Sequence, residues 1–403
     1  MKLLLVHNRY RQTGGEDEVF RRESELLRSA GHEVLEFTAH NGEIEEAGIL
    51  KKAKLALRTF WAWDSVARLR SLLRRERPDL AHFHNTFPLI SPAAYYACQQ
   101  EGIPVVQSLH NPRFICPAAT LYREGRACED CLGRVMPWPG VVHACYHNSH
   151  LQTAVIAGML AGHRILGTWQ EQVDAYIVFT DFFRQKFIGA GLPREKIFVK
   201  PHFLGTDPGM KQATGGYALF LGRLAAEKGV PTLLKAWQSL GHVPLRIVGE
   251  AQMGEYAEQF TRGNPLVSKV PYLSRKECFD LIKGARFLVW PSEGYYETFG
   301  LVAIEAFACG TPVIASRTGA MVEIVEDHKT GLQFTAGDPE DLAAKVHWAW
   351  THPEEMAAMG RVAREEYKSK YTAERNYQAL LGIYRRVLRS DSAREEIRWV
   401  FAR

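Results

Sequence analysis

One stretch of the sequence places a strand, a short loop and a helix directly after one another. The apolar residues Phe287–Trp290 are typical of a buried strand, which Pro291 ends. After the loop, an apolar run of small residues begins at Gly300 and is closed by Gly310, as expected for a helix packed on a sheet. In open sheets of parallel strands, ligands bind where such a loop meets a helix N-terminus. The stretch therefore predicts an α/β fold with a ligand site.

Two acids flank this turn, separated by seven residues. Glu297 lies in the loop and Glu305 lies in the predicted helix. A glutamate considered alone is usually a solvated surface residue. The apolar and small neighbours of Glu305 indicate instead a half-buried carboxylate, which needs a polar partner. The two acids could therefore serve one sugar nucleotide, Glu297 at the reacting sugar and Glu305 deeper in the site.

A second loop carries two cations just after a predicted strand. Tyr217–Leu221 forms the strand, and the glycine-bounded loop that follows contains Arg223 and Lys228. Arginine matches phosphate oxygens with a fork of N–H groups, and lysine supplies a mobile point charge. Both cations at one strand end would suit a diphosphate leaving group. The alternative is a solvated loop with an ion pair to Glu227.

The amino-terminal half opens with the same alternation of strand and helix. Lys2–Val6 is the first predicted strand, a loop with Gly14 and Gly15 opens a helix to about Ala30, and Glu33–Phe37 is the next strand. Two adjacent glycines are not a dinucleotide fingerprint, although they would let the backbone approach a phosphate or a sugar. The order of elements predicts a Rossmann-like domain.

Histidines follow the next two predicted strands. The predicted strand Asp79–Phe83 contains His82 near its end and is followed by His84, and Val105–Leu109 is followed by His110. The carboxyl ends of parallel strands form the ligand-binding edge of such a sheet. The histidines could therefore contact a ligand, and a hydrogen-bonded structural role is the alternative for each of them.

Four of the seven cysteines form a pattern typical of a metal site. Cys128 and Cys131 are a Cys-x2-Cys pair; eleven residues separate it from Cys116 and thirteen separate it from Cys145. Closed four-sulfur ligation of zinc often holds together a segment rich in loops, as the Pro and Gly content predicts here. Disulfides, an iron–sulfur cluster and free thiols are the alternatives.

A basic segment with aromatic residues runs through residues 51–77. It contains nine lysines and arginines against two acids, with Phe60, Trp61 and Trp63 interleaved. This pattern favours peripheral binding to an anionic membrane surface. The alternative is a surface helix that packs its apolar residues inward and leaves its basic residues solvated.

Composition sets the remaining limits. The 403 residues are too many for one ordinary core, so two domains are expected. A net charge of +5 is mild, permits an anionic ligand, and does not indicate nucleic-acid binding. No stretch of about 18 apolar residues occurs, and the amino-terminal apolar run is too short for a signal peptide. A cytoplasmic location is therefore expected.

Taken together, these motifs resemble glycosyltransferase family 4, whose members have the GT-B fold of two Rossmann-like domains facing each other across a cleft. The resemblance rests on the Arg223 and Lys228 loop together with the spacing of Glu297 and Glu305, and it covers nearly the whole chain. The four-cysteine insert is not general to the family and suggests a subgroup. The predicted parts are an acceptor domain 1–205 with the insert 112–148, a linker 206–216, a nucleotide-sugar domain 217–371, and a returning helix and tail 372–403.

The resemblance implies a retaining transferase that moves a sugar from a nucleoside-diphosphate sugar to a glycan, lipid-linked or small-molecule acceptor, as in polysaccharide biosynthesis. Arg223 and Lys228 would neutralise the diphosphate, Glu297 would contact the sugar near the reacting carbon, and Glu305 would bind the ribose. The remaining donor contacts would be the backbone of Phe299, Gly300 and Leu301, the loop glycines Gly14 and Gly15, and His110, which would bond the sugar and help place the acceptor.

No metal cofactor is expected for this chemistry, because the two cations take the place of a divalent ion and no Asp-x-Asp pattern of metal-dependent transferases occurs. A zinc ion in the insert would be structural. Other proteins share the scaffold, so a sugar-nucleotide epimerase or a phosphorylase is a rival prediction. A non-catalytic nucleotide-sugar sensor or zinc scaffold is another.

Overall fold

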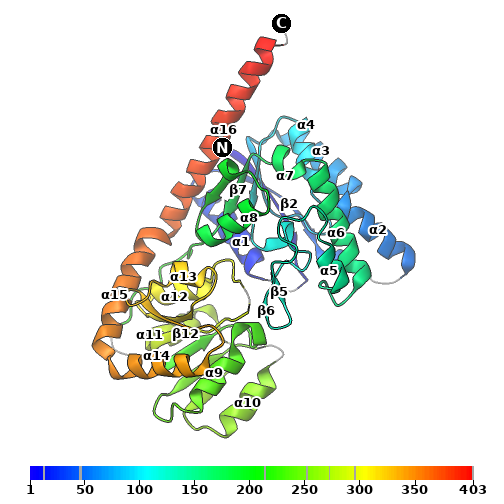
Figure 1. Ribbon diagram of the computed structural model, residues 1–403. Coiled ribbons are helices and arrows are strands. Elements are labelled where there is room, and N and C mark those ends of the chain that lie inside the picture. The colour runs from blue at the N-terminus through cyan, green and yellow to red at the C-terminus, as the bar shows by residue number, and fades with distance from the viewer. Residues whose placement is uncertain are drawn as a thin grey trace. The chain divides into compact units, whose positions relative to one another are not determined.

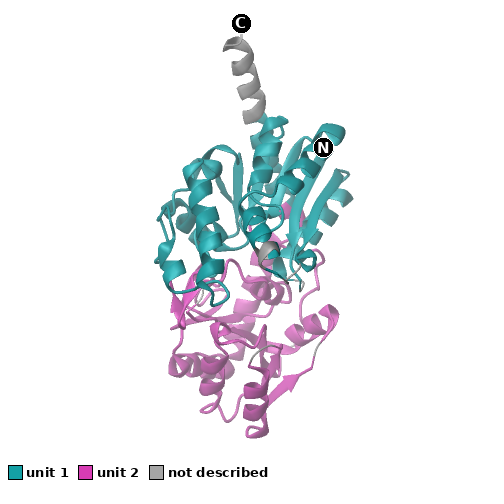
Figure 2. Cartoon of the chain, turned by 90° about the vertical axis from the view of Figure 1, so that its right-hand side faces the viewer, with its two compact units in different colours: residues 1–120, 129–200, 377–403 teal, residues 121–128, 201–376 magenta. Residues whose placement is uncertain are grey.

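The computed structural model describes residues 1–11, 14–44, 48–212, 215–250, 253–271, 273–294 and 296–401, with no account of the side chains of residues 49, 50, 52 and 390–401. It divides into two compact units, which Figure 2 colours separately. Unit 1 comprises Met1–Thr120, Glu129–Lys200 and Tyr377–Arg403, and unit 2 comprises Leu121–Cys128 and Pro201–Asn376. Each unit contains one six-stranded sheet.

The sheet of unit 1 is parallel throughout, in the order β2-β1-β3-β4-β7-β8. Every residue of β3, β4 and β7 is buried, which explains why these strands appear in the sequence as short apolar runs. The strands are β1 (Lys2–Arg9), β2 (Glu33–His40), β3 (Leu80–Asn85), β4 (Val105–Ser108), β7 (Ala175–Val178) and β8 (Ile197–Val199).

Helices pack on this sheet, and α1 lies against β1, β2 and β3 (Figure 1). The long helix α16 contributes to the same unit, where the Tyr377 hydroxyl lies 2.9 Å from His32 Nε2. The helices are α1 (Gly15–Ser29), α2 (Ile49–Phe60), α3 (Trp63–Glu76), α4 (Ala93–Gln100), α5 (Trp138–Val142), α6 (His150–Ile165), α7 (Thr168–Glu171), α8 (Asp181–Gly189) and α16 (Ala373–Phe401).

The sheet of unit 2 repeats this arrangement in the order β11-β10-β9-β12-β13-β14. All its paired strands are parallel, and its core contains fully buried residues such as Leu233, Trp237 and Phe287. The strands are β9 (Tyr217–Leu221), β10 (Leu245–Val248), β11 (Val267–Val270), β12 (Ala285–Trp290), β13 (Val313–Ser316) and β14 (Gly331–Phe334).

The helices of unit 2 pack on this sheet and on one another, with α9 on α14 and α12 on α11 and α15. Among the described residues, four short 3-10 turns, three in unit 1 and one in unit 2, complete the regular structure. The helices are α9 (Val230–Trp237), α10 (Gly254–Arg262), α11 (Arg275–Gly284), α12 (Leu301–Ala308), α13 (Met321–Ile324), α14 (Pro339–Thr351) and α15 (Pro353–Lys370).

The structure corrects several predicted boundaries. The basic segment is two helices, since residues 61 and 62 are not helical between α2 and α3. The sequence predicts a helix to Leu240 after the Lys228 loop and a last helix to Leu388, whereas α9 ends at Trp237 and α16 extends to Phe401. It also predicts a short strand at Tyr272 and Leu273, but Leu273 lies outside any strand and Tyr272 is outside the described residues. No helix in the described part of the chain is long and apolar enough to cross a bilayer.

Candidate active site

The carboxylate of Glu297 is the centre of a compact cluster in unit 2. Its Oε1 atom accepts hydrogen bonds from Lys228 Nζ at 2.7 Å, Trp290 Nε1 at 3.0 Å and Ser292 Oγ at 2.5 Å. Lys228 follows β9, whereas the other three residues lie at the end of β12 and in the loop after it. The side chain of Glu297 is 12% exposed, so the carboxylate is largely withdrawn from solvent.

The donors around Glu297 decide its charge. Burial raises the pKa of this carboxyl, but the Lys228 ammonium and the hydrogen bonds from Lys228, Ser292 and Trp290 outweigh burial and hold the pKa below its usual value. Glu297 is therefore a carboxylate at neutral pH. The loop holds a negative charge in place before any ligand arrives, which is the kind of preorganisation that electrostatic catalysis uses.

Two glycines allow these loops to meet. Gly229 has φ +71°, and a Cβ atom added there would lie 1.9 Å from the carbonyl oxygen of Pro291. Gly300 has φ +109°, and a Cβ atom there would lie 2.0 Å from the ring of Trp290. Both positions combine a left-handed backbone with contacts that leave no room for a side chain. The glycines of the sequence motif thus bring Lys228 next to Glu297.

Arg223 lies on the same loop as Lys228 but has a different partner. Its Nη2 atom donates to Glu227 Oε1 at 2.9 Å, and its side chain is 63% exposed. This is the ion pair that the sequence offered as the alternative to a phosphate site. The backbone carbonyl of Glu227 also accepts from the amide of Glu293 at 3.1 Å, which ties the two loops together.

The other predicted donor-binding residues of unit 2 lie around the start of α12. Gly300 is the residue before the helix and Leu301 is its first residue, while the ring of Phe299 is buried against Tyr371 with ring centroids 5.9 Å apart. Glu305 is half-buried, as the sequence predicts. It lies toward α11, because its charge adds to the effect of burial in raising the pKa of the Cys278 thiol.

In unit 1, His110 follows β4 at the carboxyl end of the sheet. The residue is buried, and its Nε2 atom lies 3.0 Å from Nδ1 of His84, the next-to-last residue of β3. The two rings are stacked, with centroids 5.1 Å apart. Both residues also line a small pocket with Asn111 and Arg113. The predicted placement of histidines at one sheet edge therefore agrees with the structure.

Gly14 and Gly15 form the start of α1. The amide of Gly14 donates to Asp17 Oδ2 at 2.8 Å, and the other oxygen of Asp17 lies 2.9 Å from His7 Nε2. A Cβ atom on Gly15 would meet nothing within 4 Å, so the backbone there is open to approach. Thr13, the first residue of the predicted glycine loop, is outside the described residues.

Glu16 is a site residue that the sequence interpretation missed. Its carboxylate accepts from Asn111 Nδ2 at 2.5 Å and from the Tyr10 hydroxyl at 3.0 Å, and burial raises its pKa. Glu16 thus connects the glycine turn to the residue that follows His110. The only sequence signal was an acid directly after two glycines, which is also typical of an ordinary first helical turn.

None of the seven cysteines, all of which lie in the described part of the chain, forms a disulfide. Two of the four predicted ligands, Cys131 and Cys145, lie beside Gly140 in unit 1, and Cys116 precedes a proline that contacts the same glycine. A Cβ atom on Gly140 would lie 3.6 Å from Cys131 Sγ and 3.1 Å from Pro117, the neighbour of Cys116. The amide of Cys145 donates to the Gly140 carbonyl at 3.0 Å. The fourth, Cys128, donates its amide to Leu121 at the base of a hairpin.

That hairpin is a second feature without a sequence signal. It consists of β5 (Tyr122–Arg123) and β6 (Arg126–Ala127), which pair antiparallel, and it belongs to unit 2. A Cβ atom on Gly294 would lie 2.3 Å from the carbonyl oxygen of Gly125. Glu227 and Glu293 add to burial in raising the pKa of Tyr122. The insert hairpin therefore contacts the loop that leads to Glu297.

Comparison with known proteins identifies the class of this chain. The family model described as Glycosyltransferase Family 4 matches residues 13–207, and the model described as Glycosyl transferases group 1 matches residues 209–366. Together the two models cover most of the chain, in the order of the two units. The chain is a glycosyltransferase.

It belongs to the group 1 and family 4 glycosyltransferases. It is 24% identical to the sulfoquinovosyl transferase SQD2 of Arabidopsis thaliana, over 89% of this chain and 69% of the relative. It is 31% identical to an uncharacterized glycosyltransferase of Methanocaldococcus jannaschii over 42% of this chain. That match spans 47% of the archaeal relative, about half of its length.

Solved structures show the same fold. Sucrose-phosphate synthase from Thermosynechococcus elongatus superposes with a TM-score of 0.68 at 18% identity, over 96% of this chain and 99% of that one. HepE from Anabaena, solved with UDP and glucose, gives a TM-score of 0.65 at 18% identity, over 95% and 98% of the two chains. The chain therefore has the GT-B fold, built from two parallel six-stranded Rossmann-like sheets.

Proposed function

We propose that this protein is a retaining glycosyltransferase that moves a sugar from a nucleoside-diphosphate sugar to a glycan, lipid-linked or small-molecule acceptor. The observation that carries this proposal is the Glu297 cluster. One carboxylate held at 2.7 Å from a lysine ammonium lies on a glycine-shaped turn before α12, in a chain of this family. A related structure contains UDP-glucose, which makes uridine diphosphate sugars the first donors to test.

The chemistry follows from the charges. The bond between the anomeric carbon and the phosphate oxygen breaks, so positive charge develops on the sugar and negative charge on the leaving diphosphate. The Glu297 carboxylate stabilises the sugar, and Lys228 with Arg223 stabilises the phosphate. The acceptor oxygen forms the new bond to the anomeric carbon, and its proton leaves with the departing phosphate. These steps need no divalent cation.

The remaining contacts would hold the donor in place. The backbone N–H groups of Phe299, Gly300 and Leu301 come at the start of α12, where unpaired donors suit phosphate and sugar oxygens. Glu305 would accept from the ribose hydroxyls. In the amino-terminal unit, the open backbone of Gly14 and Gly15 would approach the phosphates, and His110 would bond the sugar and help place the acceptor.

A panel of nucleotide sugars tests the proposal. The correct donor at about 100 times its dissociation constant should stabilise the protein by about 2.7 kcal/mol in thermal unfolding. With that donor, the protein should release nucleoside diphosphate and form a glycoside of unchanged anomeric configuration. Epimerised sugar nucleotide as the product would support the epimerase alternative, and sugar 1-phosphate would support a phosphorylase. Tight binding without turnover would support a sensor.

A structural zinc ion held by the insert is part of the proposal. Cys116, Cys128, Cys131 and Cys145 are the expected thiolate ligands, and the placement of Cys131 and Cys145 beside Gly140 supports this set. Zinc would hold together a segment with little regular structure and so would support the insert hairpin. Metal analysis of untagged protein should give about one zinc per chain, and Cys128→Ser should remove it. A metal content unchanged by Cys128→Ser would refute this assignment.

Peripheral binding to an anionic membrane is the last part of the proposal, and the structure narrows the predicted surface. On α3, Arg70 and Arg74 pair with Glu101, so these side chains have protein partners. In contrast, Leu57 and Trp63 are each 62% exposed, and both belong to the basic segment 51–77. The α2 end of the segment, where Lys51 and Lys54 are also exposed, is therefore the proposed contact.

Sedimentation with vesicles tests this contact. Trp63→Ser combined with Lys54→Glu should reduce binding to vesicles of anionic lipid at least about tenfold, since apolar and electrostatic contacts are both lost. Arg74→Glu is the matched control and should have a smaller effect, because Arg74 is held by Glu101. Equal vesicle binding by the unsubstituted protein, the Trp63→Ser and Lys54→Glu double variant, and Arg74→Glu would contradict the proposed contact.

A further inference from the structure

A buried network in unit 1 connects Lys200 to His110. Glu23 on α1 is 1% exposed, and Lys200, which follows β8, has no exposed surface. The Lys200 ammonium donates to Glu23 Oε1. The other carboxylate oxygen, Oε2, lies 3.4 Å from Nε2 of His84, and Nδ1 of His84 lies 3.0 Å from Nε2 of His110. A single imidazole therefore connects the buried ion pair to the strand-end histidine.

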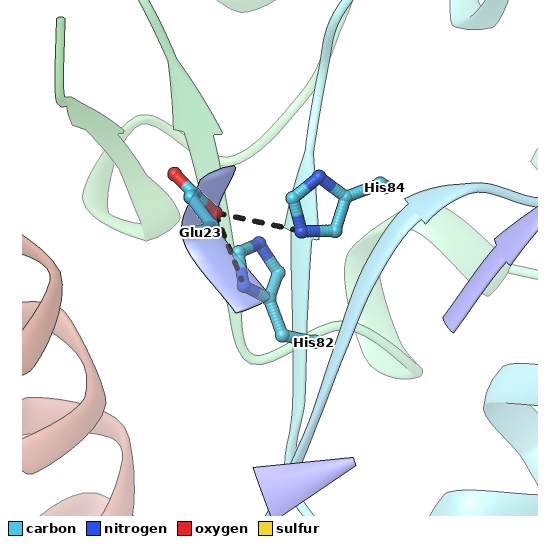
Figure 3. A group of neighbouring side chains, drawn as sticks. All are labelled: Glu23, His82 and His84. Atoms are coloured by element: carbon cyan, nitrogen blue, oxygen red, sulfur yellow. Dashed lines mark ion pairs between the residues drawn. The ribbon is translucent and has the colours of Figure 1, made fainter. Parts of the chain in front are cut away.

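Part of this network resembles a metal site in composition. Three buried side chains have ligand atoms within 4.8 Å of one another: Glu23, His82 and His84 (Figure 3). However, Lys200 already supplies a positive charge to the carboxylate. Both ring nitrogens of His82 also have partners, the Tyr384 hydroxyl at 2.7 Å and the Ser108 hydroxyl at 2.9 Å. A metal ion would place a second cation beside Lys200, so we interpret the group as a hydrogen-bond network without metal.

The protonation state of His84 limits how this network can be arranged. Burial, followed by the nearby His82, His110, His7 and Lys200, lowers the pKa of His84 well below its usual value. The ring is therefore neutral and carries one N–H group. Glu23, paired with an ammonium, offers only acceptor atoms to it. Two acceptors facing each other at 3.4 Å would repel, so the His84 proton belongs on Nε2, toward Glu23.

The two facing atoms, Glu23 Oε2 and His84 Nε2, are both buried, and neither is satisfied by a hydrogen bond of good geometry among the described residues. Glu23 Oε2 also lies 3.9 Å from Nδ1 of His82. A proton on Nε2 of His84 gives the buried oxygen an attractive neighbour, whereas a lone pair there would leave two buried acceptors facing each other. Nδ1 of His84 is then a lone pair. The hydrogen bond to His110 at 3.0 Å consequently requires His110 Nε2 to be the donor.

We propose that Glu23 and His84 are positioning residues that hold His110 in the tautomer protonated on Nε2, so that Nδ1 of His110 is a hydrogen-bond acceptor for a substrate hydroxyl. The hydroxyl would donate a hydrogen bond to Nδ1 of His110, and no proton would be transferred. The substrate contact rests on the proposed function of His110. The tautomer itself does not, because it follows from the buried network alone.

The substitution Glu23→Gln should invert the network rather than only weaken it. The Lys200 ammonium can only donate hydrogen bonds, so the new carboxamide must turn its oxygen to Lys200 and its NH2 group to His84. Nε2 of His84 then accepts, its Nδ1 carries the proton, and it donates to His110. His110 would be left with its proton on Nδ1. The inversion distinguishes a network that sets the tautomer from simple packing.

The test is nitrogen-15 NMR of the histidine rings in the full-length protein, which separates Nε2–H from Nδ1–H tautomers. The unsubstituted protein should show His110 protonated on Nε2, and Glu23→Gln should show it protonated on Nδ1. Glu25→Gln is the matched control, because Glu25 lies on the same helix, is exposed and pairs with Arg21, and it should leave the tautomer unchanged. An Nδ1–H tautomer in the unsubstituted protein, or no inversion in Glu23→Gln, would overturn the proposal.

A second variant covers the case in which Glu23→Gln does not fold. His84→Phe keeps a stacked ring beside His110 and leaves the ion pair of Glu23 and Lys200 intact. His110 should then lose its single tautomer and show a mixture, and a retained Nε2–H tautomer would contradict the proposal. Zinc added to the unsubstituted protein should leave the ring signals of His84 unchanged, whereas a shift at equimolar zinc would establish a metal site instead.

Turnover provides a separate readout. With a working donor, Glu23→Gln should reduce kcat about tenfold or more while Glu25→Gln retains it, because the wrong tautomer presents an N–H group to the substrate hydroxyl. If no nucleotide sugar is turned over by the unsubstituted protein, the proposed function fails but the NMR result still decides the tautomer. If turnover is present and the NMR inversion is not, only the positioning proposal fails.

Discussion

The two units each hold a glutamate against a lysine, and the two pairs differ in what they can reach. Glu23 and Lys200 in unit 1 are essentially without exposed surface, and the nearest groups are neutral histidines. Glu297 and Lys228 in unit 2 retain 12% and 20% exposure of their side chains. A sealed pair can act on a ligand only through a neighbour such as His84, whereas a partly open pair can contact the ligand itself. Our proposals therefore give the same two residue types a positioning role in one unit and a chemical role in the other.

The largest expected effect on stability separates the two lysines. Lys200→Met leaves a buried carboxylate without its counter-charge and should lower the free energy of unfolding by about 3–5 kcal/mol. Lys228→Met should lower it by less, about 1–2 kcal/mol, because Glu297 keeps the hydrogen bonds from Trp290 and Ser292 when the ammonium is removed. Urea unfolding of both variants measures the difference. A loss of equal size for the two would remove the distinction between a sealed and an open pair.

The double variant Lys200→Met with Glu23→Gln is the control for this measurement. Most of the loss in Lys200→Met should come from the unpaired buried charge rather than from lost packing. Removing that charge as well should therefore recover part of the stability. A double variant less stable than Lys200→Met would show that packing dominates instead.

For catalytic activity, the pair in unit 2 should matter more than its effect on stability indicates. Glu297→Gln removes the charge that faces the reacting sugar and should reduce kcat by about 10²–10³-fold, with little change in stability. Glu293→Gln is the matched control, since Glu293 lies in the same loop and accepts from the Thr232 hydroxyl at 2.6 Å, and it should retain kcat within about tenfold. Steady-state kinetics with the identified donor compares them. Similar losses in both variants would mean that the loop, rather than the Glu297 charge, is required.

The buried histidines should make unit 1 sensitive to acid. Burial lowers the pKa of His82 to about 4 from an ordinary value of about 6.5. Between these values the unfolded chain binds a proton that the folded chain does not, so stability rises with pH across this window and falls as pH drops toward 4. His82 alone should cost about 1.4 kcal/mol for each pH unit below 6.

Unfolding in urea at pH 7, 6 and 5 measures this slope. His82→Gln can still bond the Tyr384 hydroxyl but has no group that titrates in this range, so its slope should be shallower than that of the unsubstituted protein. His84, whose pKa is also lowered by burial, should maintain part of the slope. An identical slope in His82→Gln would contradict a neutral, buried His82.

The smallest expected effect concerns the insert hairpin. Gly294 has φ +62° and lies against the carbonyl of Gly125, so Gly294→Ala should cost about 1–2 kcal/mol and displace the hairpin from the Glu297 loop. Gly254→Ala is the control, because its Cβ would meet only Lys269 Nζ at 3.6 Å in the first turn of α10. Thermal unfolding compares the two. A neutral Gly294→Ala would show that the hairpin does not support that loop.

Much of the fold could be predicted from the sequence because parallel strands buried on both faces produce short apolar runs. Most strands of the two six-stranded sheets correspond to such a run, from Lys2–Val6 in the first unit to Gly331–Phe334 at the edge of the second, whereas β2 at the edge of the first sheet has one buried residue among eight. The pairing of Lys228 with Glu297 was also within reach, because both follow strands of the same sheet. Arg223 is paired with Glu227 and its side chain is largely exposed, so its contact with phosphate stays a prediction.

The contacts that the sequence could not reveal join segments far apart in the chain. Glu16 and Asn111 are separated by 95 positions, and Lys200 and Glu23 by 177, so no local pattern connects them. The insert hairpin has strands of two residues, which are too short to show an alternation. A lysine after a strand and a glutamate in a helix are ordinary surface residues in a sequence. Only the folded chain shows that they form a sealed pair.

Titration of UDP into the protein by calorimetry tests most directly whether the partly exposed pair of unit 2, Lys228 and Glu297, binds the donor. Lys228→Met should weaken UDP binding at least about tenfold, since one charge-assisted contact to phosphate is lost. Glu297→Gln should bind UDP as tightly as the unsubstituted protein or more tightly, because the Lys228 ammonium no longer has a competing carboxylate. UDP binding that is unchanged in Lys228→Met, or abolished in Glu297→Gln, would contradict the account.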